Sequence, residues 1–325
     1  MTMLDISGDA LDEQLRQGKT LPAAWYTSDA VSEAERQRIY RRTWQYAGLL
    51  EDLAKPGDFL TCTLGEAPVI VVRGNDGELR AFANVCRHRG SVIVGEACGH
   101  KTSLQCPYHA WTYRLDGTLL AAPGMKQEEG FDPERFSLPA LPIETWGPFV
   151  FVSPDPQAPP LASVLGELPA LLAATGLDLG GLRRRTRRTY DIAANWKVVL
   201  DNYLECYHCP VAHKGFTDLI DLENYTVTEY EQFSTQTGPV KNATGLYDTS
   251  GGVTAGFYAY VWPNFTINVY PGPGNVSLNL FLPVGAHRTI ATYEYLFTPA
   301  VSQAEEEEFT RFIDQVQEED VVLCE

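Results

Sequence analysis

The feature that most constrains this sequence is a pair of short motifs, each of which contains one cysteine and one histidine. The first is Cys86-Arg87-His88 and the second is Cys106-Pro107-Tyr108-His109, with seventeen residues between them. Thiolates bind iron–sulfur clusters and zinc, and imidazoles bind zinc and iron. These four side chains at such short spacing predict a metal centre, and the fold must bring the two segments together to form it.

Two kinds of metal centre use this set of ligands. Structural zinc sites commonly group cysteine with cysteine and histidine with histidine. A Rieske centre instead has two histidines on one iron of a [2Fe-2S] cluster and two cysteines on the other. Because each segment here supplies one cysteine and one histidine, the pattern favours the Rieske cluster, and structural zinc is the alternative. Cys62, Cys98 and His100 lie outside the motifs and are predicted to pack or to lie at the surface.

A second group of potential metal ligands follows later in the chain. Asn195 is a suitable N-cap for a helix over Trp196–Cys209, which the next residue, a proline, should end. His208 would lie on the last turn of this helix and His213 beyond the break, so that the two imidazoles can converge. Glu205 precedes His208 by three residues and would share its face of the helix.

Two convergent histidines suggest a carboxylate as third ligand, because non-haem Fe(II) oxygenases bind iron through two histidines and one carboxylate. Ser302 and Glu305 form a capping-box pattern that predicts the start of a helix. Asp320 falls within the apolar stripe of this helix, whereas Glu318 and Glu319 lie nearer its edge. A metal would partner a carboxylate on a buried face; the alternative is that Asp320 is a helix-end residue near the surface. The stripe consists of Phe309, Phe312, Ile313, Val316 and Leu323.

With both motifs, the sequence resembles the Rieske-type non-haem iron oxygenases over about residues 35–325. The family's cluster motif is C-x-H-R-G…C-P-Y-H-x-W, and its iron motif is D/E-x-x-H-x4-H followed by a distant Asp on the last helix. The cluster motif is present as Cys86, His88, Arg89, Gly90, Cys106, Pro107, Tyr108, His109 and Trp111, and the iron motif as Glu205, His208, His213 and Asp320.

The resemblance implies a role for each of these residues. Cys86 and Cys106 would hold one iron of the cluster, and His88 and His109 the other. The mononuclear iron ligands would be His208, His213 and Asp320. Glu205 would be a bridging acid between a cluster histidine, His109 or His88, of one subunit and His208 of the next, in a homotrimer arranged head to tail.

The resemblance also implies the partners of the reaction. The chain would be a terminal oxygenase that uses O2 and a small organic substrate. Its electrons would come from NAD(P)H through a separate flavin/iron–sulfur reductase or a ferredoxin, because the sequence has no dinucleotide-binding fingerprint of its own. A Rieske electron carrier without oxygenase activity and a zinc-stabilised binding protein are the alternatives from other classes.

Two details bear on the substrate and on the length of the chain. Many ring dioxygenases have Asp at the bridge, whereas Glu205 resembles the branch that acts on quaternary ammonium compounds such as carnitine and related betaines. Tyr258, Tyr260 and Trp262 would share one strand face and could form an aromatic cage for such a cation or pack in the core. We therefore expect hydroxylation or oxidative N-demethylation of a small quaternary ammonium compound, with an aromatic ring as the alternative substrate. Family members usually run on past the residue that matches Asp320, whereas this sequence stops five residues after it.

The distribution of strand and helix signals predicts an α+β protein. Residues 1–40 are expected to form a helical segment that packs on the catalytic domain, and a helix is expected over residues 31–47 with Ser32 as its N-cap. Residues 41–155 would form an antiparallel β Rieske domain, with turns at Asp-Gly pairs. A proline-rich linker over Ser153–Pro160 would lead to residues 156–325, a helix-grip-like catalytic domain with an antiparallel sheet and helices.

Composition narrows the possible partners. The net charge is −17, which argues against binding to nucleic acid or to anionic membranes. The basic run Arg183–Arg188 is therefore expected to be a solvated strand face. Residues Met1–Ala10 lack the basic start and apolar core of a signal peptide, and we expect a cytoplasmic protein. The clustered cysteines among the seven are accordingly expected to serve metal or redox chemistry and not disulfides.

Overall fold

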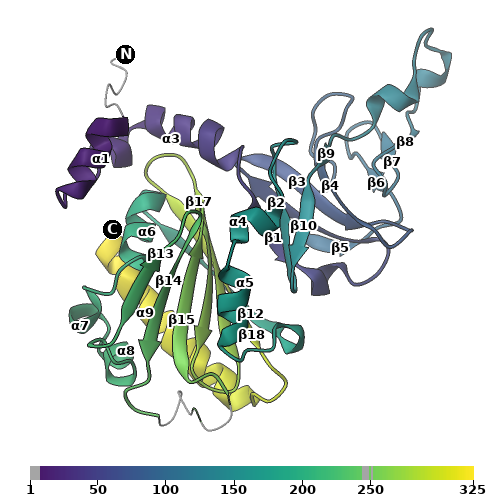
Figure 1. The fold of residues 1–325 in the computed structure, drawn as a ribbon. Coiled ribbons are helices and arrows are strands. Elements are labelled where there is room, and N and C mark those ends of the chain that lie inside the picture. The colour runs from purple at the N-terminus through teal and green to yellow at the C-terminus, as the bar shows by residue number, and fades with distance from the viewer. Residues whose placement is uncertain (1–7, 244–248, 250–251) are drawn as a thin grey trace.

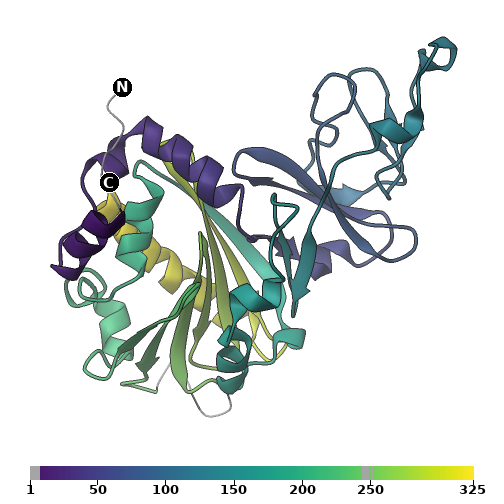
Figure 2. The same ribbon diagram turned by 45° about the horizontal axis from the view of Figure 1, so that its top comes forward.

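The structure, a computed structural model, describes all residues except 1–7, 244–248 and 250–251 (Figure 1). A β-rich domain and a larger domain with a seven-stranded sheet lie side by side, and an N-terminal helical segment lies over the larger domain (Figures 1 and 2). The predicted α+β class, with an antiparallel β domain before a mixed domain, is confirmed.

The β-rich domain contains three antiparallel sheets with the orders β5-β2-β3-β4-β9, β6-β7-β8 and β1-β11-β10. Its Asp116-Gly117 turn requires glycine, because φ of Gly117 is 86° and a Cβ atom there would lie 2.5 Å from the ring of Phe82. The strands are β1 Gln45–Leu49, β2 Asp58–Leu64, β3 Ala67–Arg73, β4 Leu79–Ala83, β5 Cys98–His100, β6 Leu104–Gln105, β7 Thr112–Tyr113, β8 Leu119–Ala121, β9 Ala140–Leu141, β10 Ile143–Trp146 and β11 Phe149–Val152, with short 3-10 helices at Leu50–Leu53, Met125–Gln127 and Pro133–Phe136.

The N-terminal segment consists of α1 Gly8–Arg16, α2 Ala24–Thr27, α3 Asp29–Glu35 and a π-helical turn, Arg36–Tyr40; residues 1–7 of the predicted segment lie outside the described residues. A buried ion pair of 2.6 Å between Lys197 and Glu35 fixes α3 to the larger domain. The predicted helix over residues 31–47 is wrong at both ends. It begins before Ser32, and its last residues are in β1, where Tyr46 stacks on Phe265 with ring centroids 4.6 Å apart. Packing between the domains thus overrides the local helical pattern.

The larger domain is built on one antiparallel sheet of order β12-β18-β17-β16-β15-β14-β13. One face packs on α4 and α5, and the other packs on α6 and on the long helix α9, which crosses the sheet (Figure 1). The predicted strands around 225–237 and 254–298 are confirmed. The strands are β12 Arg183–Ile192, β13 Thr226–Glu229, β14 Phe233–Pro239, β15 Ala255–Val261, β16 Phe265–Tyr270, β17 Asn275–Pro283 and β18 Thr289–Phe297; the helices are α4 Leu161–Leu165, α5 Leu168–Ala174, the 3-10 turn Leu179–Gly181, α6 Trp196–Tyr203, α7 Cys209–Ala212, α8 Lys214–Leu219 and α9 Gln303–Cys324.

The caps of the two helices that lead to the candidate site follow the sequence. The Asn195 side chain accepts a hydrogen bond from the backbone N–H of Lys197 at the start of α6. Ser302 and Glu305 form both hydrogen bonds of the predicted capping box at the start of α9. These caps satisfy backbone groups that a helix start leaves without partners, and they fix where each helix begins.

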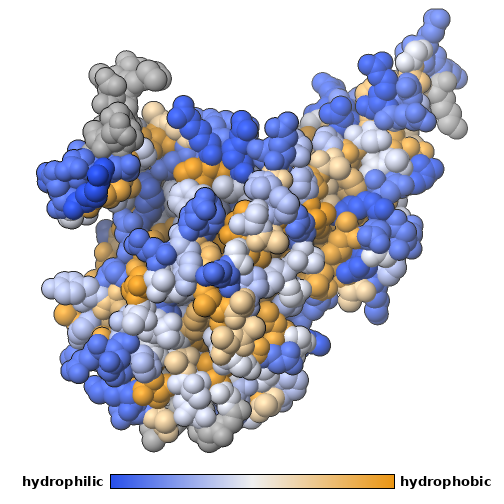
Figure 3. All heavy atoms as spheres, in the orientation of Figure 1, coloured by the Kyte–Doolittle hydropathy of each residue, from blue (hydrophilic) through white to orange (hydrophobic). Residues whose placement is uncertain are grey.

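The surface is mixed in character. Hydrophilic residues cover the N-terminal helices and the outer end of the β-rich domain, and hydrophobic residues gather in small groups over the middle of the face shown in Figure 3. In the basic run, Arg184 forms ion pairs with Asp52 at 2.6 Å and with Glu294 at 2.9 Å. Arg185 and Arg188 also form ion pairs, with Glu306 and Asp314. Acidic residues of the same chain therefore partner much of the basic run. None of the helices described by the structure is long and apolar enough to span a membrane.

Candidate metal centres

The two Cys/His motifs lie in loops at the outer end of the β-rich domain. Cys86 and His88 follow β4, and Cys106 and His109 lie between β6 and β7. The loops meet, since the ring centroids of the two histidines are 4.7 Å apart. Both histidines are exposed, whereas Cys86 and Cys106 are only 3% and 2% exposed. The site thus has two sulfurs inside and two imidazoles at its outer rim.

The chemistry of this donor set fits a [2Fe-2S] cluster. Burial raises the pKa of Cys106, but hydrogen bonds from the backbone N–H of Tyr108 and from Cys86 outweigh burial and place the pKa below its ordinary value. The thiolate is the form that binds metal. Desolvation and the charge of His109 lower the pKa of His88, which favours the neutral imidazole that a metal requires. The predicted Rieske centre therefore suits these four residues.

Two aromatic side chains, Trp111 and Tyr113, contact the residues of the Cys/His loops. Trp111 stacks on His88 with ring centroids 4.9 Å apart. The hydroxyl of Tyr113 lies 3.4 Å from Sγ of Cys86 and accepts a hydrogen bond from the backbone N–H of Arg87 at 3.0 Å. Hydroxyl contacts of this kind tune the sulfurs of a cluster. Sequence reasoning missed Tyr113, although its place two residues after the motif tryptophan was a usable signal.

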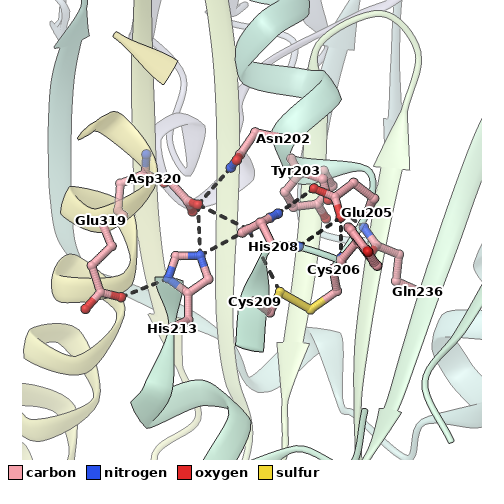
Figure 4. A network of polar contacts seen from close by, with 12 residues as sticks. Asn202, Tyr203, Glu205, Cys206, His208, Cys209, His213, Gln236, Glu319 and Asp320 are labelled. Atoms are coloured by element: carbon pink, nitrogen blue, oxygen red, sulfur yellow. Dashed lines mark hydrogen bonds and ion pairs between the residues drawn. A yellow bond between two sulfur atoms is a disulfide. The ribbon is translucent and has the colours of Figure 1, made fainter. Parts of the chain in front are cut away.

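The second site brings together His208, His213 and Asp320 (Figure 4). Nε2 of His208 and Nε2 of His213 are 3.1 Å apart, and Oδ1 of Asp320 lies 2.9 Å from Nε2 of His213 and 3.5 Å from Nε2 of His208. His213 is 2% exposed. Two imidazole nitrogens and one carboxylate oxygen converge on one point, which is the donor set of a non-haem iron site. The structure thus places the three predicted ligands together; that they bind iron stays a prediction.

A second layer of polar side chains orients these three. Oε2 of Glu319 lies 2.8 Å from Nδ1 of His213, and Oε1 of Glu205 lies 2.5 Å from Nδ1 of His208. Nδ2 of Asn202 donates to Oδ1 of Asp320 at 2.7 Å. In Figure 4, Glu319 and Glu205 lie on the outer sides of the two histidines, and the carboxylate of Asp320 lies above both rings and contacts each. Carboxylates in such positions hold the ring orientation and raise the basicity of a metal-binding imidazole. Sequence analysis named Glu205 for this layer but not Glu319 or Asn202.

The carboxylates and imidazoles of the site shift one another's pKa values. The interaction with Asp320, opposed by burial and aided by Glu205, raises the pKa of His208 to about 9. Burial would lower the pKa of His213, but Asp320 and Glu319 outweigh it and raise that pKa. Burial would raise the pKa of Asp320, yet the two histidines outweigh it and hold that pKa below its ordinary value. Because a metal binds the neutral imidazole, metal binding at this site should be weaker at low pH.

The chain around these ligands differs from the predicted helix over Trp196–Cys209. The helix α6 ends at Tyr203, and Pro210 lies in the first turn of the next helix, α7, instead of ending the first. Proline is favoured there because the first turn needs no N–H donor. His208 is the N-cap of α7 and His213 follows its last residue. Glu205 reaches His208 from a non-helical turn and not from a shared helix face.

A disulfide joins Cys206 and Cys209 across this turn. The expectation that the cysteines would form no disulfides is therefore wrong for this pair. The other cysteines that the structure describes are free thiols. Sγ of Cys209 lies 3.9 Å from Nε2 of His208, so the disulfide is part of the wall around the candidate iron site (Figure 4).

A cavity opens beside His208 and Asp320, between α6, α7, α9 and the sheet. Cross-strand pairing aligns Gln236, Tyr258 and Asn268 on the face of the sheet that lines it. Aromatic and amide side chains make up most of its wall. The aromatic members are Tyr203, Phe216, Tyr225, Tyr258, Tyr270 and Tyr293, and the amides are Asn202, Gln236, Asn268, Asn279 and Gln317.

Of the three residues predicted to form an aromatic cage, Tyr258 lines this cavity and the other two do not. Tyr260 and Trp262 share the strand face but line a separate hollow together with Leu204. The Tyr260 hydroxyl donates to the carbonyl of Pro263 at 2.7 Å. Alternation along β15 identified the face correctly, but it could not tell how far the cavity extends along the strand.

The apolar stripe of α9 also ends earlier than predicted. Phe309 and Ile313 are buried, whereas Leu323 is 52% exposed. The side chain of Asp320 is 21% exposed and points into the cavity between the histidines. It is therefore neither a core residue nor a free surface residue.

The two candidate metal centres lie on opposite sides of the molecule. In both ribbon views the hairpin β6–β7 is at the outer end of the β-rich domain, and α7 is on the far side of the larger domain (Figures 1 and 2). Direct electron transfer between them within one chain is therefore disfavoured. A second subunit could bring a cluster loop next to α7, as the resemblance implies.

Comparison with known protein families covers both domains. The Rieske [2Fe-2S] domain family matches residues 43–144, and the catalytic domain of the ring-hydroxylating alpha subunit matches residues 179–252 and 248–325. An electron carrier or a zinc-stabilised protein would lack the second domain, so both alternatives are excluded. The described fold carries donor sets for both metal centres of this family.

Similar proteins act on quaternary ammonium compounds. The carnitine monooxygenase oxygenase subunit of Acinetobacter pittii is 35% identical over 86% of this chain and 76% of its own length. The chloroplastic choline monooxygenase of Arabidopsis thaliana is 35% identical over 96% of this chain and 76% of its own length. The crystal structure of the quaternary ammonium Rieske monooxygenase CntA with L-carnitine superposes with a TM-score of 0.83 at 32% identity, over 94% of this chain and 83% of that one.

A more distant structure supports the fold alone. Naphthalene 1,2-dioxygenase from Rhodococcus sp. superposes with a TM-score of 0.84 at 21% identity, over 98% of this chain and 85% of that one. The fold, including the order of its two domains, is therefore similar in a protein of quite different sequence.

Proposed function

We propose that this chain, which belongs to the Rieske-type ring-hydroxylating oxygenase family, oxidises a small quaternary ammonium compound by hydroxylation or oxidative N-demethylation. As an oxidoreductase of this family it carries a Rieske [2Fe-2S] cluster and a mononuclear iron, and needs O2, an organic substrate and electrons from a reductase. When bound, the cluster supplies single electrons and the iron activates O2. The substrate, the metal ligands and the assembly are the proposed parts.

The aromatic wall of the cavity carries this proposal. A quaternary ammonium group has no N–H to donate, so its binding relies on ring faces and on nearby negative charge. Tyr258 and Tyr270 are buried beside the candidate iron site, with ring centroids 5.6 Å apart, and Asp320 and Glu205 provide carboxylates at the same cavity. Relatives named for carnitine and choline point to the same class of substrate.

In this proposal the chain's own residues divide the work. His208, His213 and Asp320 would hold the mononuclear iron, and Glu319 would fix the ring of His213. The aromatic wall would orient the cation so that one carbon beside the nitrogen faces the iron. Holding the reacting atoms at short distance is a large part of what a protein adds to such chemistry. Cys86, His88, Cys106 and His109 would hold the cluster.

Glu205 is proposed to connect two subunits. Its Oε1 holds Nδ1 of His208, and its side chain remains 44% exposed, so a further donor can reach it. In a head-to-tail homotrimer that donor would be His109 or His88 of a neighbouring chain, both of which are exposed at the tip of the β-rich domain.

Replacing Glu205 with Gln tests the bridge. Both metals should remain bound, but single-turnover oxidation of the reduced cluster should slow by orders of magnitude. Glu223→Gln, an exposed change away from the site, is the control. Cluster oxidation at the unchanged rate with normal product would remove Glu205 from electron transfer.

A substrate screen tests the proposed reaction. The iron-loaded protein, a reductase and NAD(P)H are incubated with quaternary ammonium compounds and with aromatic hydrocarbons, and O2 uptake, hydroxylated product and formaldehyde are measured. Coupled O2 uptake and product with the ammonium compounds is the expected result. Coupled turnover with the aromatic compounds alone would overturn the proposed substrate class.

A further inference from the structure

Apart from His208 and His213, the polar side chains that line the cavity are neutral or acidic. Its only ionisable residues besides tyrosines and the two cysteines of the disulfide are Glu205, His208, His213 and Asp320, and no lysine or arginine of the described residues lines it. Away from the two histidines, a carboxylate in this cavity would find no lysine or arginine to pair with, and burial of an unpaired charge is unfavourable. The residues that line the cavity should therefore bind an ammonium compound with an uncharged tail more tightly than one with a carboxylate tail.

One amide oxygen of this wall has no hydrogen-bond partner among the described residues. Asn279 on β17 is 3% exposed, and its Oδ1 has no hydrogen-bond partner among the described residues. A buried amide oxygen without a partner is unfavourable, so a ligand that donates a hydrogen bond to it binds more tightly.

The other amides are engaged. Asn202 donates to Asp320 at 2.7 Å, and Asn268 accepts from the Tyr203 hydroxyl at 2.6 Å. Gln236 accepts from a tyrosine hydroxyl at 3.0 Å and donates to the backbone carbonyl of Tyr203 at 2.8 Å. Gln317 accepts from the hydroxyl of Tyr293. Asn279 is therefore the amide of this wall that is left for a ligand.

We propose that Asn279 receives the tail of the substrate, and that this tail carries a hydroxyl or another neutral hydrogen-bond donor and not a carboxylate. This inference rests on the proposed function, because it presumes that the aromatic wall holds a quaternary ammonium group. The substrate class is then a quaternary ammonium alcohol. Asn279 acts as a specificity-determining residue, because it discriminates between tails while the aromatic wall binds the common head.

Binding measurements on the iron-loaded protein under nitrogen separate the two parts of the inference. Isothermal titration calorimetry compares choline, which has a hydroxyl, with ethyltrimethylammonium, which lacks it, and with glycine betaine and carnitine, which have a carboxylate. Choline should bind about 3–10-fold more tightly than ethyltrimethylammonium, the range of one net hydrogen bond, and at least about 100-fold more tightly than both carboxylates.

Two matched variants locate the effect. Asn279→Leu should abolish the advantage of choline and leave ethyltrimethylammonium binding unchanged, which also reports that the variant is folded. Asn275→Leu is the control, because Asn275 lies on the same strand, is 4% exposed and also has an unpartnered Oδ1, but does not line the cavity.

The outcomes distinguish the two proposals. Equal binding of choline and ethyltrimethylammonium, or carboxylates that bind as tightly as choline, would overturn the role of Asn279 and leave the quaternary ammonium function standing. Absence of binding by all four compounds would overturn both. Loss of the choline advantage in Asn275→Leu would overturn the assignment to Asn279 alone.

Discussion

The two candidate metal centres are built in opposite ways. The cluster site takes its four residues from two loops of one small domain, and its histidines face solvent. The mononuclear site takes two histidines from the ends of α7 and a carboxylate from the last helix, more than a hundred residues later, and places them in a cavity. A site of the first kind is determined by local spacing, whereas one of the second kind depends on how a helix lies across a sheet.

The difference has a physical consequence. The cluster loops need only their own hairpins to bring the ligands together, so changes in the larger domain should leave the cluster intact. The mononuclear site requires α9 to stay in place, because Asp320 and Glu319 both come from it. Each change below acts on one site and leaves the other as an internal control.

The largest effect is expected from Asp320→Ala. Removing the carboxylate leaves two imidazoles, too few to hold the iron, so mononuclear iron and turnover should be lost while the visible spectrum of the cluster persists. Metal analysis and absorption spectra of the same sample measure both. Glu318→Ala, an exposed neighbour on α9, is the control. Full iron content in Asp320→Ala would contradict the ligand assignment.

The next effect concerns the cluster site alone. His109→Cys places a thiolate where a neutral imidazole now stands, and a cluster with more thiolate ligands has a reduction potential lower by about 100 mV or more. Redox titration of the cluster signal measures this shift. His100→Cys adds a thiol on the same domain outside the motif and should leave the potential unchanged. An unaltered potential in a fully loaded His109→Cys protein would argue against His109 as a ligand.

A smaller effect is expected from Glu319→Gln. The carboxylate 2.8 Å from Nδ1 of His213 orients the ring, and loss of such a partner weakens metal affinity by about 10–100-fold. Competition with a chelator measures the affinity for Fe(II). Glu307→Gln, earlier on the same helix, should retain the original affinity. An equal affinity for Fe(II) in both variants would show that the contact from Glu319 to His213 does not strengthen metal binding.

The smallest effect is expected at the far end of the same helix. Ser302→Ala removes the capping box of α9 and should lower the free energy of unfolding by about 1 kcal/mol. Both metals should stay bound, because the last turns of the helix are held by packing and not by the cap. Chemical denaturation and metal analysis measure the two properties. Loss of the mononuclear iron in this variant would mean that the start of the helix also positions Asp320.

The same contrast explains what could be predicted from the sequence. The cluster residues were predicted from their spacing, and His208, His213 and Asp320 from motif and periodicity; the structure brings the residues of each set together. The role of Glu319 was missed. Periodicity placed it at the edge of the apolar stripe of α9, but periodicity predicts burial and does not show that His213 lies opposite. Tyr260 and Trp262 were chosen from a face that is longer than the cavity. The helix predicted over residues 31–47 was drawn too long because Tyr46 packs on Phe265 of the other domain, a contact that no local pattern contains.

The disulfide between Cys206 and Cys209 has a consequence for how the protein is handled. It closes a ring of only four residues, so its contribution to global stability should be well below the roughly 3 kcal/mol of a fifteen-residue loop. Its effect is local, because Tyr207 and His208 are the two residues inside the ring. A thiol reductant in the purification buffer would open the ring by exchange. Two preparations with identical sequence and iron content could then differ covalently beside the same histidine, and assays of this protein should report which buffer was used.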